Sequence, residues 1–156
     1  MRIGVPKEIK PQEHRIGLTP ESVKTLVSEG HEVIFENNGG FEAGFDNAQY
    51  IKAGAKIADK PSDIFNDAEI IVKVKEPQKV EVEMIRENQI IYTYLHLAAA
   101  KELTEGLIRT KSINIAYETV TDENGRLPLL APMSAVAGRM SVQAGAHCLE
   151  KNQNGR

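Results

Sequence analysis

Short apolar runs alternate with helical patterns along most of the chain. Runs that suit strands occupy residues 2–5, 31–36, 69–75, 89–95 and 113–117, and a shorter run occupies 56–58. Helical patterns lie between them, over residues 20–29, 46–53, 61–68 and 98–109. Strands that alternate with helices imply βαβ crossovers. We therefore predict an α/β fold with a mostly parallel sheet and helices on both faces.

The first predicted helix has clear boundary signals. Thr19 is a suitable N-cap, and Pro20 fits the first helical position. Residues 23, 26 and 27 give the apolar stripe of a half-buried helix. Gly30 is expected to end the helix.

The end of the chain has a different character. Residues 132–151 lack β-branched runs and are rich in Ala, Gly, Met and Ser, with apolar residues at helical spacing. This pattern predicts a long helix with few partners inside the chain. We therefore divide the chain into a substrate domain, residues 1–130, and a connector helix, residues 131–156.

Composition narrows the function classes. The chain has 156 residues, 41% of them apolar, and a net charge of −3 with both signs interspersed. It has no basic stripe for nucleic acid and no stretch of about 20 apolar residues for a membrane span. Residues 1–6 do not resemble a signal peptide, and Cys148 has no second cysteine to pair with. We expect a cytoplasmic protein that binds neither nucleic acid nor membranes.

Candidate chemistry gathers where predicted strands end. Arg15 follows the first strand, Lys75 and His96 follow two later ones, and Glu118 follows the strand over 113–117. In open parallel sheets, ligands bind beyond these carboxyl ends. An arginine fork matches a carboxylate, a lysine can polarise a carbonyl, and a histidine can transfer protons near neutral pH. The set suits a small 2-oxo or 2-amino acid.

Each of these residues also has a structural interpretation. His96 could be a core histidine with satisfied hydrogen bonds, and Lys75 an edge-strand lysine. Arg15 could form a surface ion pair with Glu13 that contributes little to stability. Met133 could serve packing alone. Only the shared location of several groups favours a site.

Other signals are weaker. Residues 39–44 form a glycine-rich loop, but they lack the Gly-x-Gly-x-x-Gly spacing of a dinucleotide loop, so we interpret the loop as structural. His14, His31 and His147 show no metal-site spacing. No metal is therefore expected.

Five segments resemble one known family, in order along the chain. They resemble the alanine dehydrogenases and the alpha subunit of proton-pumping transhydrogenase. The segments are MRIGVPKEIKPQEHRIGLTPE (1–21), VKVKEP (72–77), YTYLHL (92–97), AYETV (116–120) and LLAPMSAVAGRMSVQAGA (129–146). The segment Tyr-Leu-His-Leu and Arg15 favour alanine dehydrogenase over transhydrogenase.

The resemblance implies roles for individual residues. Arg15 and Lys75 would bind the carboxylate and carbonyl of pyruvate or L-alanine, and His96 would donate and accept protons. Tyr94 and Met133 would line the substrate pocket.

The resemblance also implies an activity and a cofactor. Ser134 would contact NAD. The intact enzyme would convert L-alanine to pyruvate and ammonia with NAD, as a homo-oligomer that is a hexamer in the family. The nucleotide fingerprint is not among these 156 residues, so we expect a truncated chain that is inactive alone and either monomeric or dimeric. The alternatives are a stand-alone assembly module and a fragment like the transhydrogenase alpha subunit.

Overall fold

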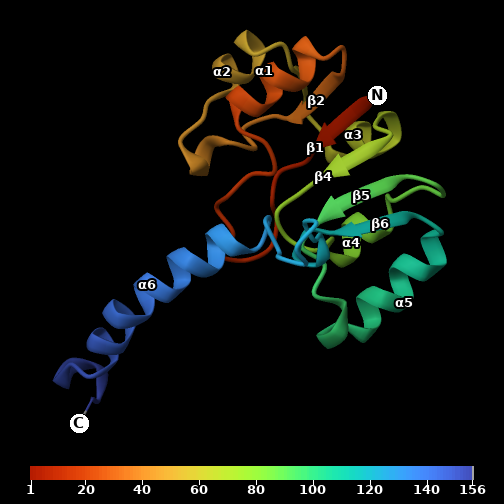
Figure 1. Ribbon diagram of the computed structural model, residues 1–156. Coiled ribbons are helices and arrows are strands. Elements are labelled where there is room, and N and C mark those ends of the chain that lie inside the picture. The colour runs from red at the N-terminus through yellow and green to blue at the C-terminus, as the bar shows by residue number, and fades with distance from the viewer. Residues whose placement is uncertain (156) are drawn as a thin grey trace. The chain divides into compact units, whose positions relative to one another are not determined.

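The computed structural model describes residues 1–155, and its centre is a six-stranded sheet (Figure 1). The strands are β1 (Arg2–Val5), β2 (Glu32–Glu36), β3 (Lys56–Ala58), β4 (Ile70–Val72), β5 (Ile90–Thr93) and β6 (Ile113–Ala116). Their order across the sheet is β3-β2-β1-β4-β5-β6, and every neighbouring pair is parallel. The predicted α/β class with a parallel sheet is confirmed.

Helices cover both faces of this sheet, as predicted (Figure 1). The helices of the sheet-containing part are α1 (Pro20–Ser28), α2 (Asn47–Lys52), α3 (Pro61–Asp67), α4 (Lys79–Val82) and α5 (Lys101–Thr110). A sixth helix, α6 (Ala131–Cys148), follows the sheet in the sequence. The first five alternate with the strands, which is the crossover pattern that a parallel sheet requires. The four-residue helix α4 was not predicted.

Two apolar clusters lie on opposite faces because successive strand residues point to opposite sides. One cluster packs α1 and α2 on the sheet, with Phe35 stacked on Tyr50 at a ring-centroid distance of 3.6 Å. The other packs α3 and α5 on the opposite face, where Ile34, Ile71 and Ile91 are buried. The strands are therefore apolar on both faces, which is typical of an all-parallel sheet.

The boundaries of α1 follow the sequence signals. The Thr19 hydroxyl accepts a hydrogen bond from the Ser22 N–H at 3.3 Å, and Pro20 occupies the first turn. Gly30 has a φ of 81°, a conformation that glycine adopts without a steric penalty. The predicted cap, first turn and stop signal are confirmed.

Two strands are shorter than predicted. The runs over 69–75 and 89–95 give only Ile70–Val72 and Ile90–Thr93. The two segments still exchange bonds beyond these limits, from Lys73 N to Tyr92 O and from Tyr94 N to Val74 O. On the other side of this segment, toward β1, a carboxylate takes the place of the next ladder bond. The Val74 N–H donates to Glu8 Oε1 at 2.6 Å. The sequence pattern could not predict this side-chain substitution.

The chain divides into two compact units after Ala116. The first contains the whole sheet and α1 to α5. The second contains a short 3-10 turn, Tyr117–Thr119, then the predicted long helix α6 and a further turn, Lys151–Gln153. No helix within residues 1–155 is long and apolar enough to cross a membrane.

Candidate functional site

The strand order places a topological switch point between β1 and β4, because the chain leaves β1 toward β2 and leaves β4 toward β5. Ligands of open α/β sheets bind outside the carboxyl ends of the strands at such a point. The loop of residues 6–19 follows β1 here and approaches β4 closely. A Cβ added to Gly17 would lie 2.7 Å from the Val72 carbonyl oxygen, so glycine is needed for this approach.

Arg15 is held in this loop by Glu13. The Glu13 carboxylate accepts from Arg15 Nε at 2.8 Å, from Arg15 Nη2 at 2.6 Å and from the Arg15 backbone N–H at 2.9 Å. The Glu13 side chain is 6% exposed, whereas that of Arg15 is 48% exposed. The hydrogen bonds from Arg15 lower the pKa of Glu13 to about 2. The predicted pair exists, and its acid is well shielded from solvent.

Lys75 and Tyr94 share the electrostatic environment of this pair. The positive charge of Lys75 contributes to the lowered pKa of Glu13. Hydrogen bonding to Glu13 raises the pKa of Arg15, and Tyr94 adds a smaller effect of the same sign. Tyr94 itself is only 8% exposed. The structure therefore brings together three of the residues that the resemblance assigned to the substrate.

A buried ion cluster lies at the same edge of the sheet. Lys73, 1% exposed, places its Nζ 3.2 Å from Glu8 Oε2 and 2.8 Å from Glu81 Oε1. Burial raises the pKa of Glu8, against the opposing charge of Lys73 and the hydrogen bond from Val74. The three groups join the loop after β1, the end of β4 and helix α4. We name them the Glu8–Lys73–Glu81 cluster.

This cluster gives Lys73 and Lys75 different roles. Alternation along an extended strand would place the two lysines on one face, but Lys73 is fully buried in ion pairs and Lys75 is partly exposed. Glu8 Oε1 also accepts from the Lys75 N–H at 3.4 Å. The cluster therefore fixes the backbone of Lys75, while the Lys75 side chain lies outside the cluster.

His96 lies three residues beyond the end of β5, at the start of the 3-10 turn Leu97–Ala99. Its φ of 51° is in the left-handed region, which is uncommon for a residue with a Cβ. The residue is exposed, so the interpretation of a core histidine is wrong. Its ring centroid lies 6.2 Å from that of Tyr94, at an interplanar angle of 44°.

The two remaining candidates lie in the second unit. Met133 and Ser134 occupy the first turn of α6, where Met133 is partly exposed and Ser134 is exposed. The Ser134 N–H donates to the Leu130 carbonyl at 3.1 Å, so this backbone group serves the start of the helix. Glu118 lies in the turn Tyr117–Thr119, also in the second unit.

Sequence reasoning missed Glu8 and Glu81. Glu8 precedes Lys73 by 65 residues, so their pairing has no local signal. The one available sign in the sequence was that Glu81 stands between two valines. Within residues 1–155, no three His, Cys, Asp or Glu side chains are grouped as a metal site would require.

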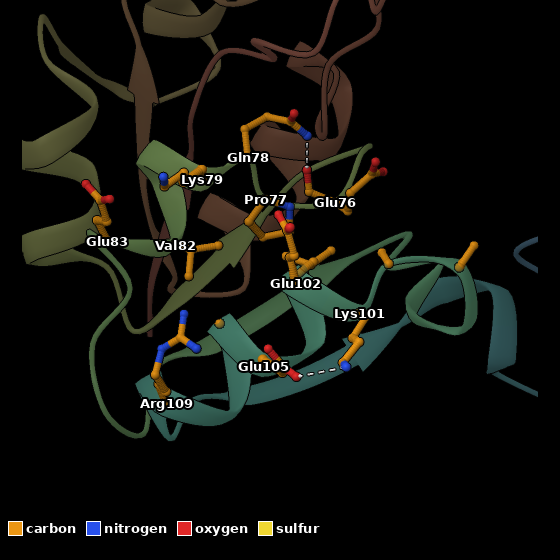
Figure 2. Close-up of a pocket in the computed structure, with 14 residues that line it drawn as sticks. Glu76, Pro77, Gln78, Lys79, Val82, Glu83, Lys101, Glu102, Glu105 and Arg109 are labelled. Atoms are coloured by element: carbon orange, nitrogen blue, oxygen red, sulfur yellow. Dashed lines mark hydrogen bonds and ion pairs between the residues drawn. The ribbon is translucent and has the colours of Figure 1, made fainter.

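Two hollows open on the first unit. A shallow one is lined by Gly39, Glu42 and residues of the loop after β1, which are Lys7, Glu8, Glu13, His14 and Arg15. A larger one, of about 660 Å³, lies between α4 and α5 (Figure 2). Its rim carries charges of both signs, including the pair Lys101–Glu105 at 3.9 Å, and it contains none of Arg15, Lys75, Tyr94 and His96. The size of a hollow therefore does not identify the candidate substrate site.

The residues of the first unit do not form a dinucleotide cradle at the switch point. A Rossmann loop after β1 needs three glycines, so that the pyrophosphate can approach the backbone. Here the loop holds Gly17 alone, and that glycine packs against Val72. The loop instead presents Glu8, Glu13 and Arg15. This edge suits a small carboxylate and not a pyrophosphate.

The fold and site together define an α/β domain with a doubly wound parallel sheet and a group of charged residues at its switch point. The family model "Alanine dehydrogenase/PNT, N-terminal domain" matches residues 4–137. The chain belongs to this family.

Relatives and solved structures agree with that assignment. The chain is 53% identical to an alanine dehydrogenase from Halomonas elongata and 51% identical to one from Geobacillus stearothermophilus, over 99% and 100% of its length. It spans 42% of each relative. A solved L-alanine dehydrogenase superposes with a TM-score of 0.92 at 53% identity, over 100% of this chain and 43% of the other.

A transhydrogenase from Sinorhizobium meliloti has the same fold. Its TM-score is 0.74 at 24% identity, over 80% of this chain and 35% of the other. At this identity the likeness concerns the fold alone.

Proposed function

We propose that this chain provides the substrate-binding part of an alanine dehydrogenase, and that it binds pyruvate and L-alanine by their carboxylate. One observation carries the proposal: an arginine fork, fixed by Glu13, lies at the switch point of a parallel sheet, within electrostatic reach of Lys75 and Tyr94. Arginine recognises carboxylates through parallel N–H···O bonds.

Each side chain has a role that follows from its chemistry. Arg15 would fix the carboxylate, and Lys75 would polarise the carbonyl oxygen of pyruvate. His96 would hold or deliver a proton at that oxygen or at the amino nitrogen, since histidine titrates near neutral pH. Tyr94 would line the pocket, with Met133 at its edge.

The activity of the whole protein belongs to the same proposal. That activity is the oxidative deamination of L-alanine to pyruvate and ammonia, with NAD accepting the hydride and Ser134 contacting the cofactor. We also propose homo-oligomers, and a division into a substrate segment, 1–130, and a connector helix, 131–156. Residues 1–156 alone would be inactive, because they do not contain the glycine fingerprint that positions the dinucleotide. NADH formation from alanine and NAD by these residues alone would contradict this.

The test is a pyruvate titration followed by NMR on the 156-residue chain. We expect saturable shifts of the His96 ring protons with a Kd near 1 mM, which corresponds to about −4 kcal/mol. Arg15→Ala should abolish these shifts, because the carboxylate loses its fork. Arg109→Ala is the matched control, since Arg109 lines the larger hollow between α4 and α5. Equal loss in both variants, or no shifts in the folded wild-type chain, would overturn the proposal.

An assembly module is the second candidate, because α6 exposes Val136, Met140 and Val142. Light scattering at high concentration distinguishes the two candidates. A dimer that Met140→Ser dissociates, together with no pyruvate shifts, would favour the module. A monomer without pyruvate shifts would favour a transhydrogenase-like chain with a vestigial substrate site.

A further inference from the structure

Glu13 is a negative charge placed inside a site for anions. Its carboxylate contacts Arg15 through Nε and Nη2, and it lies close enough to Lys75 for that lysine to lower its pKa. With a pKa of about 2, Glu13 stays ionised at neutral pH. A carboxylate at this position competes electrostatically with any ligand that carries more than one negative charge.

The charges around the site can be counted from their pairings. Arg15 and Lys75 contribute two positive charges, and Glu13 removes one of them, so the group has a net charge of +1. The remaining cations of the same loop act on other carboxylates, since Lys10 bonds Glu76, His14 bonds Glu42, and the charge of Lys7 acts on Glu36 and Glu42. The Glu8–Lys73–Glu81 cluster beneath the site has a carboxylate in excess. The surroundings therefore add no further positive charge.

We propose that Glu13 determines the charge class of the substrate, so that the site accepts 2-oxo and 2-amino monocarboxylates and discriminates against the corresponding dicarboxylates. This inference rests on the proposed function, because it concerns the same site. Without Glu13, Arg15 would attract monoanions and dianions and would not discriminate against the second carboxylate. Glu13 balances one cation and leaves charge for one carboxylate.

The size of the effect follows from Coulomb's law. A second ligand carboxylate about 6 Å from Glu13 would be repelled enough to weaken its binding about tenfold, at an effective dielectric constant of about 40, between that of a protein surface and that of bulk water. Removing the Glu13 charge should remove that penalty for the dianion. The affinity for the monoanion should rise as well, but only through the one charge that the monoanion carries.

The experiment compares L-lactate with L-malate, which differ by one carboxylate group and are stable in solution. The dissociation constants of both are measured by NMR on the 156-residue chain, and their ratio is the readout. We expect Glu13→Gln to shift the ratio about tenfold toward L-malate. The ratio remains interpretable even if the variant weakens both ligands by loosening Arg15.

Two further variants separate charge from geometry. Glu13→Asp keeps the charge, so its ratio should stay at the wild-type value even if both affinities fall. Glu29→Gln changes the net charge of the chain equally, at an exposed residue at the end of α1 that does not line the hollow around Arg15. Its ratio should also stay unchanged.

The outcomes distinguish this inference from the proposed function. If the wild-type chain binds pyruvate but the ratio is the same in Glu13→Gln, the role of Glu13 is refuted and the substrate site stands. A shift in Glu13→Asp as large as in Glu13→Gln would assign the effect to geometry, and an equal shift in Glu29→Gln would assign it to net charge; either refutes the inference. If the wild-type chain does not bind pyruvate, both proposals fall.

Discussion

The two units of this chain differ in what stabilises them. In the first, both faces of the sheet are covered, and side chains such as Phe35, Ile71 and Ile91 are fully buried. In the second, the 18-residue helix α6 has no buried residue, and Val142 is 76% exposed. Burial of apolar area stabilises the first unit, whereas α6 has mainly its own backbone hydrogen bonds.

This difference shows that a helical sequence pattern does not by itself provide a packed helix. Isolated helices shorter than about 12–15 residues are marginal in water, and most helical stability in proteins comes from packing. α6 exceeds that length, yet two of its interior residues are glycine, which is a poor helix former. Its exposed apolar side chains would gain stability only from a surface that covers them.

The largest effect in the first unit should come from Lys73→Met. The change leaves the buried carboxylates of Glu8 and Glu81 without their shared cation, which typically costs about 3–5 kcal/mol. Urea unfolding followed by circular dichroism measures the loss. The control is Lys111→Met, which removes an exposed pair with Glu87 at 3.7 Å and should cost less than about 1 kcal/mol. Equal costs would contradict the distinction between buried and exposed ion pairs.

A smaller effect should appear in the acid stability of Glu13→Gln. The pKa of Glu13 is about 2 in the folded chain, below its ordinary 4.5. The ion pair with Arg15 therefore contributes its full stability above pH 4.5 and loses it as the pH falls toward 2. The difference in unfolding free energy between wild type and Glu13→Gln should shrink over this window.

Urea unfolding at pH 7, 4 and 3 measures that difference. Glu29→Gln, at the end of α1, is the control for a change of one charge on the surface. A difference between wild type and Glu13→Gln that stays constant down to pH 3 would mean that the pair does not stabilise the fold.

The smallest effect should come from Val142→Ser on α6. A side chain that is already exposed loses little burial, so the unfolding free energy of the first unit should change by less than about 0.5 kcal/mol. Hydrogen exchange should show rapid exchange of α6 amides and slow exchange of β1 and β4 amides in both proteins. A clear destabilisation of the sheet would show that α6 supports the first unit.

Much of the fold was predictable because its signals are local. Alternation of apolar runs with helical patterns predicted the parallel sheet, and Thr19 and Gly30 marked the limits of α1 correctly. Parallel strands also place Arg15, Lys75 and His96 at one edge once the strands are known. The carboxyl end of β4 was predicted wrongly, and there Glu8, a side chain from the first loop, replaces a ladder bond at Val74.

The sequence by itself determined the class of fold, the family and the residues that can carry the chemistry. The tertiary structure decided how their charges combine. It buried Lys73 between Glu8 and Glu81, placed the ionised Glu13 on Arg15 close to Lys75, and left α6 exposed. The physical reason is the distance along the chain: Glu8 and Lys73 lie 65 residues apart. Burial and Coulomb interactions depend on neighbours in space, which no local pattern of residues encodes.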